Sequence, residues 1–335
     1  MTIYFRPLVQ HGPVAPGAVP LAGGPLWFSH VEQLTRTAPP QVLPASMVPA
    51  QNLARLSQPR KPIAGLDLGA PRIMGIVNVT PDSFSDGGQT GDVASALAAA
   101  RAMVAAGVDL IDVGGESTRP GADLIPVDVE IARTAPVIAA LGELGVPLSI
   151  DTRKAEVAKA AIKAGADLVN DVSGFGYDPE LAPLCAAHQI PVCTMHAQGD
   201  PATMQNNPRY NHVLLDVYDT IAAQVDHLVT TGIARDQIMV DPGIGFGKTV
   251  AHNLELLQNI ALFHGLGCAI LLGVSRKGFI GKLGNVPDPQ MRGPGSVAVG
   301  LAALAQGVQV LRVHDVTETA QALCLWQAVR TGSGT

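Results

Sequence analysis

The chain has 335 residues, which suits either two domains or one large α/β domain with an appendage. Its 22 basic and 28 acidic residues give a net charge of −6, which argues against nucleic-acid binding because no excess of cations is available to neutralise phosphates. Aromatic residues make up 4% of the chain and hydrophobic residues 47%, so we expect a core of Ala, Val, Ile, Leu and Gly.

The first 62 residues differ from the rest of the chain. They contain 11 of the 26 prolines and show no alternation of strand-like and helix-like segments. Because such proline density favours extended chain, we predict that residues 1–62 form a proline-rich N-terminal extension that is weakly ordered or arm-like. Within it, residues 49–57 have the pattern of one or two amphipathic helical turns.

From residue 72 onward, short β-branched runs alternate with Ala-rich helical stretches. The expected strands are apolar on both faces and comprise Ile73–Val79, Asp109–Val113, Pro147–Asp151, Asp167–Val172, Ile190–Met195, Gln237–Val240, Ala269–Val274 and Gln309–Val313. The expected helices are Val93–Ala106, Val127–Leu144, Lys154–Ala164, Pro179–His188, Asn211–Thr230, Asn253–His264, Pro294–Gln306 and Val316–Arg330. Eight such units match a closed (β/α)8 TIM barrel, which we predict for residues 63–335.

An open doubly wound sheet is the structural alternative. The first expected strand runs into Asn78 without the GxGxxG loop that such sheets usually carry. The run Asp241–Thr249 resembles a phosphate-binding GxxxxGK[ST] loop, yet Pro242 occupies the position of its first glycine. We therefore expect no loop of that kind.

The four cysteines form no CxxC pair and have no histidine at zinc-finger spacing, so we expect free thiols in a reducing compartment. The N-terminus lacks the basic and apolar regions of a secretory signal. The longest uncharged run, residues 293–311, is interrupted by Gly, Pro and Gln and is expected to form a buried helix and strand. We therefore expect a cytoplasmic protein that neither spans nor binds a membrane.

Polar residues lie at the end of every expected strand, where a TIM barrel builds its active site. In chain order these are Asn78, Asp112, Asp151, Asn170 and Asp171, His196, Asp241, Ser275 to Lys277, and Arg312 and His314. Each has an ordinary explanation by itself: Asp151 could cap a helix, Asp171 could hold a loop, and His196 could be a core imidazole. Eight strands that end in polar residues at the same end indicate a ligand site instead.

The chemical types of these residues indicate the ligand. Fixed carboxylates such as Asp151 and Asp241 suit a ring rich in N–H donors, for example an aminopyrimidine, because a buried carboxylate is costly without a donor. Lys277, Arg312 and His314 supply donors that suit a phosphate, although ion pairs with the carboxylates would also explain them.

Two loops have the composition of lids. Residues 80–88 and 116–121 follow the first two expected strands and are rich in Gly, Pro, hydroxyl groups and charges. Turn chemistry explains the Gly and Pro but not Phe84 or Arg119, so we expect these loops to close over a substrate.

Taken together, these motifs resemble those of the dihydropteroate synthase family. They run in order as Met74–Gly88 (MGIVNVTPDSFSDGG), Gly114–Gly121 (GGESTRPG), Ser149–Thr152, Asn170–Gly174, Asp241–Lys248 (DPGIGFGK), Ser275–Lys277 and Arg312–Val316. The resemblance covers roughly residues 63–335 and leaves the proline-rich extension outside.

The resemblance implies a transferase of folate biosynthesis with a TIM-barrel fold. Such an enzyme condenses 6-hydroxymethyl-7,8-dihydropterin diphosphate with 4-aminobenzoate and forms 7,8-dihydropteroate and diphosphate. The resemblance further implies Mg²⁺ as cofactor, a homodimer, and a 4-aminobenzoate pocket that sulfonamides occupy.

The resemblance also implies roles for individual residues. The pterin contacts would be Asp151, Asn170, Asp241, Lys277 and, over the face of the ring, Arg312. The diphosphate would be held by Asn78, Arg312 and His314, with Asn78 also near Mg²⁺. The 4-aminobenzoate pocket would be formed by Thr118, Arg119, Pro120, Val172, Met195, Phe246 and Ser275 to Lys277. The residues assigned to catalysis are Asp151, Asp241, Lys277, Arg312 and His314.

Two other interpretations stay open at this point. A barrel of the methyltetrahydrofolate:corrinoid methyltransferase type shares the Asp and Asn ring contacts but needs no diphosphate site, which argues against it. A catalytically silent pterin-binding paralogue would carry the same motifs as an active enzyme.

Overall fold

The computed structural model describes residues 2–79, 88–117, 124–199 and 204–332. Thr118, Arg119, Pro120 and most of the two expected lid loops lie outside these residues.

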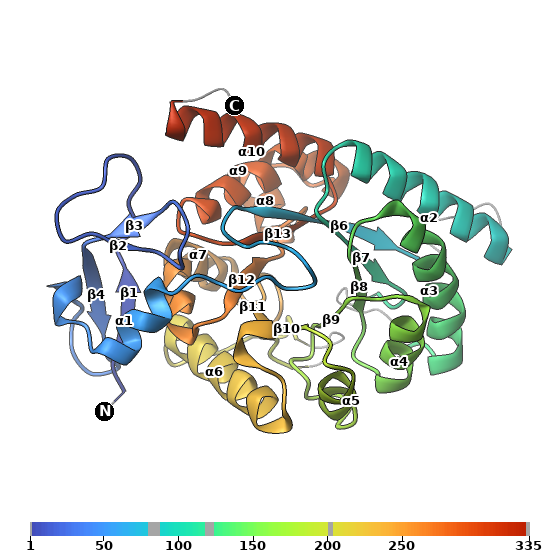
Figure 1. The fold of residues 1–335 in the computed structure, drawn as a ribbon, viewed down its shortest axis with the longest axis horizontal. Helices are drawn as coiled ribbons and strands as arrows, with labels where there is room; N and C mark the ends of the chain where they lie inside the picture. The colour runs from blue at the N-terminus through green and yellow to red at the C-terminus, as the bar shows by residue number, and fades with distance from the viewer. Residues whose placement is uncertain (1, 80–87, 118–123, 200–203, 333–335) are drawn as a thin grey trace.

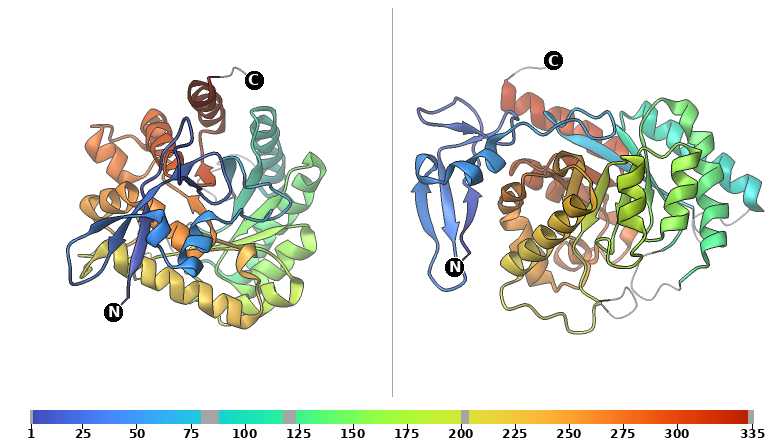
Figure 2. Two further views of the ribbon diagram at one scale, coloured as in Figure 1. Left: turned by 60° about the vertical axis from the view of Figure 1, so that its left-hand side comes forward. Right: turned by 60° about the horizontal axis from the view of Figure 1, so that its bottom comes forward.

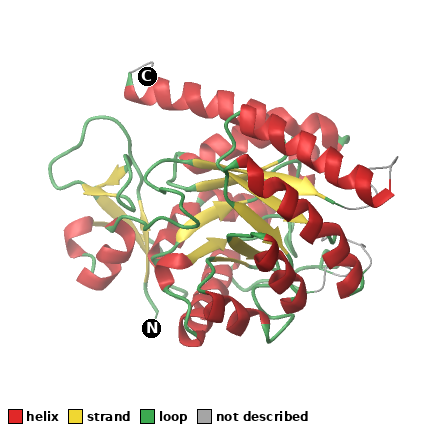
Figure 3. Ribbon diagram, turned by 45° about the vertical axis from the view of Figure 1, so that its right-hand side comes forward, coloured by secondary structure: helices red, strands yellow, loops and turns green. Residues whose placement is uncertain are grey.

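Eight parallel strands form a closed barrel at the centre of the molecule, surrounded by helices (Figures 1 and 3). In chain order they are β6 (Arg72–Asn78), β7 (Leu110–Gly114), β8 (Leu148–Asp151), β9 (Leu168–Asp171), β10 (Val192–Met195), β11 (Ile238–Asp241), β12 (Ala269–Leu272) and β13 (Val310–Val313). Strands that follow one another in the chain are neighbours in the barrel, and β13 pairs with β6 to close it. The predicted TIM barrel and its eight strands are confirmed.

Helices follow the strands and cover the outside of the barrel. They are α2 (Gly88–Ala105), α3 (Val127–Leu141), α4 (Ala155–Ala164), α5 (Leu181–His188), α6 (Val213–Thr231), α7 (Val250–Gln258), α8 (Gly278–Leu283), α9 (Gly293–Leu304) and α10 (Val316–Thr331). Short 3-10 helices complete the connections: η2 (Gly142–Leu144), η3 (Arg235–Gln237), η4 (Ile260–Leu266) and η5 (Pro289–Arg292). The short, glycine-rich helix α8 lacks the Ala-rich pattern of the others and was not predicted.

The bottom of the barrel, where the strands begin, is closed by apolar side chains. Met74, Leu110 and Leu168 are buried near the starts of their strands and pack into one cluster. Ile63 and Leu68, from the segment that precedes β6, join this cluster. Because the side chains of this cluster are apolar, the polar groups of the barrel interior lie at the opposite end, where the strands finish.

Residues 4–57 form a small unit beside the barrel, as both views of Figure 2 show. Its elements are β1 (Tyr4–Pro7), β2 (Val19–Pro20), β3 (Trp27–Phe28), β4 (His30–Leu34), β5 (Gln41–Pro44), η1 (Ala45–Met47) and α1 (Ala50–Ser57). The strands form an antiparallel sheet in the order β1-β4-β5 and a second pair, β2 with β3. We call this unit the N-terminal module.

In the structure this stretch is folded, so the weak order that its proline content suggested is not observed. Phe28, Val31 and Leu56 are fully buried and belong to a hydrophobic cluster of the module itself. The prolines are tolerated because they stand at element boundaries: Pro7 ends β1, and Pro49 directly precedes α1. The expected helical turns near residues 49–57 are present as α1.

The module is also fastened to the barrel. The hydroxyl of Tyr4 donates hydrogen bonds to both carboxylate oxygens of Asp219 on α6, at 2.9 and 3.0 Å. Arg36 forms ion pairs of 2.7 Å with Asp216 and with Asp219 on the same helix. The extension is therefore an ordered part of the fold.

Over the described residues, no helix has the length and apolarity needed to cross a membrane. All four cysteines are free, and Cys324 alone of the four is exposed. Burial raises the pKa of the other three thiols, so they are protonated packing groups at neutral pH.

Candidate active site

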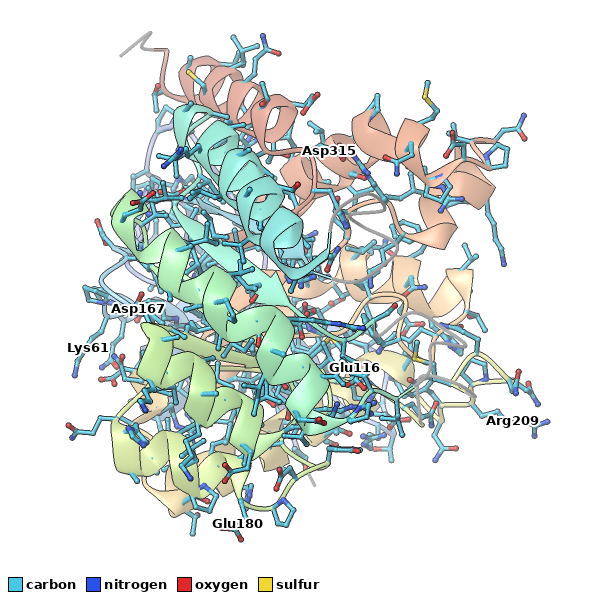
Figure 4. All side chains as sticks on the ribbon, turned by 90° about the vertical axis from the view of Figure 1, so that its right-hand side faces the viewer. Lys61, Glu116, Asp167, Glu180, Arg209 and Asp315 are labelled. Carbon is cyan, nitrogen blue, oxygen red and sulfur yellow. The ribbon has the colours of Figure 1, made fainter. Side chains whose placement is uncertain are left out.

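The polar strand ends meet at the end of the barrel where the strands finish. Backbone pairing places Asn78 beside Gly114, Gly114 beside Asp151, and Asp151 beside Asn170, so that these positions on β6 to β9 share one level. On the other side of the barrel, Asp241 is paired with Met195. Figure 4 separates the two ends: Asp167, which precedes β9, lies to the left of Glu116, which follows β7.

Arg312 is the centre of the first group of side chains. Its Nε donates to Oδ2 of Asp112 at 2.6 Å, and its Nη2 donates to Oδ2 of Asp151 at 2.7 Å. Asn170 donates from Nδ2 to the same Oδ2 of Asp112 at 3.1 Å. One guanidinium therefore joins residues of β7, β8 and β13 across the barrel interior.

The electrostatics of this group follow from its burial. Burial opposes the charge on Arg312, but the neighbouring carboxylates of Asp112 and Asp151 outweigh it and raise the pKa of the guanidinium above its ordinary value. Burial raises the pKa of Asp151 to about 7, with Arg312 acting in the opposite direction. Asp151 is thus poised between its protonated and ionised forms near neutral pH.

The buried carboxylate of Asp112 is not fully satisfied by hydrogen bonds within the described residues. Its side chain is fully buried, and its Oδ1 has no hydrogen-bond partner among the described residues. The sequence placed Asp112 at a strand end but gave it no role. A single carboxylate within the apolar run Leu110–Val113 was the available signal, because such a group requires a buried partner.

Asp241, Lys277 and Phe246 form the second group. Oδ1 of Asp241 accepts a hydrogen bond from the backbone N–H of Gly243 at 2.7 Å. Nζ of Lys277 lies 4.0 Å from the centroid of the Phe246 ring, in cation–π geometry. Burial lowers the pKa of Lys277 to about 8 while Asp241 opposes the shift, and burial raises the pKa of Asp241.

Ser275 and His314 form a third contact. Oγ of Ser275 accepts a hydrogen bond from the backbone N–H of His314 at 3.1 Å and lies 3.0 Å from Nδ1 of its ring. Arg276, which the resemblance also assigned to the edge of the 4-aminobenzoate pocket, bonds Asp315 through two nitrogens, at 2.5 and 3.1 Å. Its guanidinium supports the start of α10 rather than the site.

Two of the alternative explanations raised by the sequence are correct for their residues. Asp171 holds the loop after β9, because its carboxylate accepts from the backbone N–H groups of Ser173 and Phe175 at 2.7 and 2.6 Å. His196 is buried and is satisfied within the protein by Lys248. The helix-capping explanation fails for Asp151, because α4 begins after Lys154 and Asp151 bonds Arg312.

The remaining predicted side chains surround these groups. Met195 is buried at the end of β10, while Val172, just after β9, and Phe246 are half-buried. An ideal Cβ atom at Gly114 would lie 3.5 Å from Oδ1 of Asn78 and 3.6 Å from Cβ of Asp151. Asn78 therefore faces the same space as the Arg312 group.

No cluster of three or more His, Cys, Asp or Glu side chains suited to a metal ion occurs in residues 2–79, 88–117, 124–199 and 204–332. Mg²⁺ commonly takes one or two oxygen ligands from protein and the others from water and substrate phosphates. The amide oxygen of Asn78 fits that mode, as a single protein ligand to a metal that arrives with a diphosphate.

A barrel with these groups at its mouth has the features of a pterin-binding enzyme, and the family model described as "Pterin binding enzyme" matches residues 74–314. Dihydropteroate synthase of Synechocystis is 46% identical over 250 residues, which are 74% of this chain and 86% of that protein. Dihydropteroate synthase of Escherichia coli is 44% identical over 264 residues, which are 78% of this chain and 93% of that protein.

Solved structures agree. Yersinia pestis dihydropteroate synthase, in a sulfonamide drug complex, is 45% identical with a TM-score of 0.75 and matches 79% of this chain and 96% of that one. The Xanthomonas albilineans enzyme with 4-aminobenzoic acid is 43% identical, also with a TM-score of 0.75, over the same shares. The chain belongs to the dihydropteroate synthase family and is a transferase.

Proposed function

We propose that this dihydropteroate synthase joins 4-aminobenzoate to the methylene carbon of 6-hydroxymethyl-7,8-dihydropterin diphosphate at the barrel mouth, with release of diphosphate. The observation that carries the proposal is the Arg312 group, in which one cation is held between two carboxylates at distances of 2.6 and 2.7 Å. In support, the Xanthomonas albilineans relative has been solved with 4-aminobenzoic acid and with 7,8-dihydropteroate.

The pterin ring is bound by the acceptors of the mouth. Asp151 and Asp241 accept hydrogen bonds from ring N–H groups, Asn170 bonds the ring edge, and Lys277 donates to a ring acceptor. Arg312 lies over the face of the ring. Burial raises the pKa values of Asp151 and Asp241 in the free enzyme, and donors on the pterin ring would offset this cost by stabilising the ionised carboxylates.

The leaving group is stabilised by donors on β6 and β13. Cleavage of the bond between the methylene carbon and diphosphate oxygen places negative charge on the diphosphate and positive charge on the pterin. Arg312, His314 and Asn78 stabilise the first charge, and the carboxylates of Asp151 and Asp241 offset the second. Because the methylene carbon is already electron-deficient at this point, the arylamine requires positioning and exclusion of water more than a strong base.

Mg²⁺ is part of the proposal as a partner of the diphosphate. When bound, it supplies positive charge to the phosphate oxygens. Asn78 offers the protein oxygen for it.

The 4-aminobenzoate pocket lies beside Phe246 and Ser275, with Val172 and Met195 flanking the ring. Thr118, Arg119 and Pro120 are proposed as further contacts of 4-aminobenzoate on the family resemblance alone. Sulfonamides compete for this pocket; the Yersinia pestis relative, solved in a sulfonamide drug complex, supports this assignment.

The test is a reconstitution with pure protein. Wild-type enzyme with the pterin diphosphate, 4-aminobenzoate and Mg²⁺ is expected to form dihydropteroate, and Asp241→Ala is expected to lose activity through pterin binding. Folded wild-type protein that binds the pterin without product would support the silent paralogue. Methyl transfer from methyltetrahydrofolate to a corrinoid would support the other barrel class, and unchanged pterin affinity in Asp241→Ala would contradict the assignment of that residue.

We further propose a cytoplasmic homodimer whose chain divides into residues 1–62 and a pterin-binding barrel at 63–335. The separate hydrophobic cluster of the N-terminal module and the membership of Ile63 in the barrel-bottom cluster support this division. Leu325 and Val329 lie one turn apart on α10 and are 62% and 83% exposed, which supports a partner on this face. Sedimentation analysis of wild-type enzyme and a Val329→Glu variant tests the dimer.

A further inference from the structure

Lys248 is a buried lysine to which the proposed reaction assigns no contact. It lies in the β11–α7 loop, two residues before α7 begins, and is 3% exposed. Its Nζ lies 2.9 Å from the carbonyl oxygens of Gly243 and Phe246, 2.9 Å from Nδ1 of His196, and 3.3 Å from the carbonyl oxygen of His196. Its side chain forms no ion pair with the described residues.

When Lys248 is protonated, its contact with His196 allows only one assignment of donor and acceptor. An ammonium group has three donors and no acceptor, so Nδ1 of His196 accepts and the ring proton lies on Nε2. Burial, assisted by Lys248, lowers the pKa of His196 to about 3, so the imidazole is neutral under ordinary conditions. The three protons of Lys248 are thereby shared among one imidazole and backbone carbonyls of two different loops.

This arrangement is costly for the protein. Burial lowers the pKa of Lys248 to about 7, Asp241 opposes the shift only in part, and the charge of Lys277 adds to it. An apolar side chain at such a position is often at least as stabilising as a buried charge. The presence of a lysine at this buried position therefore indicates that the hydrogen bonds of its ammonium group are required.

The loop that Lys248 contacts is held through its backbone. Besides the bonds from Lys248, the N–H of Gly245 donates to Oδ1 of Asn253 and the hydroxyl of Tyr210 donates to the carbonyl oxygen of Gly247, both at 2.8 Å. Gly243, Gly245 and Gly247 have φ values of 68°, 84° and 61°, in the left-handed region that favours glycine. A side chain at Gly243 would overlap the carbonyl oxygen of His196, so the loop lies directly against the end of β10. With three glycines in five positions, the shape of this loop depends on bonds made to its backbone.

The same loop positions two groups of the site. The N–H of Gly243 donates to Oδ1 of Asp241 at 2.7 Å. The ring of Phe246 supports Nζ of Lys277 at 4.0 Å. A shift of the backbone between residues 243 and 246 would therefore displace one contact of Asp241 and one of Lys277 together.

We propose that Lys248 is a positioning residue for the reaction: its ammonium ties the Gly243–Gly247 loop to His196 and thereby holds Asp241 and Lys277 in their binding geometry. This inference rests on the proposed function, because Asp241 and Lys277 are its pterin contacts. Lys248 touches neither substrate, so its effect on the reaction is exerted through the loop.

The test compares Lys248→Met, which removes the ammonium and keeps most of the stem, with Lys163→Met on the exposed side of α4 as the matched control. Circular dichroism verifies folding. Calorimetry measures the affinity for the pterin diphosphate without 4-aminobenzoate, and kinetics separate KM for 4-aminobenzoate from kcat. We expect kcat/KM of folded Lys248→Met to fall about 10- to 100-fold, the size of loss that a misplacement near 1 Å produces. Pterin affinity should weaken, while Lys163→Met matches wild type.

A merely structural role would lower the amount of folded enzyme and leave KM and pterin affinity of the folded fraction unchanged. That result for Lys248→Met overturns the inference. If Lys248→Met fails to fold, His196→Ala removes one of its partners and retains the ammonium; weaker pterin affinity there supports the inference, and unchanged affinity or failure to fold overturns it. Absence of product from the wild type refutes the proposed function instead, and the pterin calorimetry still decides the role of Lys248.

Discussion

The bridge from Arg312 to two carboxylates gives a stability prediction with a defined pH dependence. Arg312→Met leaves Asp112, which is fully buried, and Asp151, whose side chain is 10% exposed, without their shared cation. Removal of one partner of a buried ion pair typically costs about 3–5 kcal/mol. We expect a loss of this size in the free energy of unfolding at pH 8.5.

The loss should shrink at lower pH. The pKa of Asp151 in the folded protein is about 7 and so lies above its unfolded value. A carboxyl with a raised pKa reduces stability as pH rises from its unfolded pKa to its folded pKa. Without Arg312 the folded pKa of Asp151 rises further, so this reduction continues above pH 7. At pH 5.5 Asp151 is protonated in both proteins, and the difference between them should be smaller.

Urea unfolding followed by circular dichroism at pH 5.5 and pH 8.5 measures both quantities. Arg72→Met is the matched control, because the Arg72–Asp109 pair is also an ion pair of a barrel strand but its side chains are 27% and 22% exposed. We expect about 0–1 kcal/mol for this control. A loss in Arg312→Met that equals the control, or that does not change with pH, would refute the reasoning.

Three further predictions concern the protonation of Asp151 and His264 and the packing of Leu56. Pterin binding at pH 6 should release close to one proton, because ring donors favour the ionised form of Asp151, and calorimetry in two buffers of different ionisation enthalpy should show no such release for Asp151→Asn. The pKa of His264 is lowered to about 3, chiefly by burial, so the folded state excludes a proton that the unfolded state binds below pH 6. Between pH 5.5 and 4.5, His264→Leu should reduce the slope of unfolding free energy against pH by about 1.4 kcal/mol per unit, and an unchanged slope would contradict the assigned protonation. Leu56→Ala should cost about 2–5 kcal/mol in urea unfolding with kcat unchanged, whereas a negligible loss would mean that the module core does not support the fold.

The barrel was predictable because its signal is local. Strands buried on both faces appear as short apolar runs, and parallel barrel strands must all end at the same mouth. Asn78, Asp151, Asn170 and Asp241 follow from that rule alone. These polar residues lie at strand ends, where burial of an apolar residue would cost less free energy. That observation was sufficient to predict that they lie together.

The pairing of these residues was not predictable in the same way. Arg312 bonds Asp112, which lies 200 positions away in the chain, and this pairing depends on distances that no sequence spacing encodes. Lys248 appeared in a motif that failed as a phosphate loop, and only the folded loop shows its Nζ directed at backbone carbonyls.

The N-terminal module was missed for a third reason. Its core joins residues from β1 to α1 through contacts distant in sequence, and proline content describes only the element boundaries. Phe28 and Leu56 meet in one cluster although 28 positions separate them in the chain. The proline content therefore indicated where secondary-structure elements end, but not whether the segment folds.

The shared level of Asn78, Gly114, Asp151 and Asn170 has a consequence for specificity. Neighbouring strands in a sheet are about 4.8 Å apart, and that spacing is set by backbone hydrogen bonds. The distances between the groups that we propose as contacts of the pterin and its diphosphate are therefore fixed by the barrel. A substitution can remove one of these contacts but can hardly move it. An analogue with its donors at other spacings would require a change of strand register, which would disrupt the packing of the whole barrel. The proposed choice of pterin substrate is thus as durable as the fold, whereas the proposed arylamine contacts Val172, Phe246 and Ser275, which follow strand ends, are freer to vary.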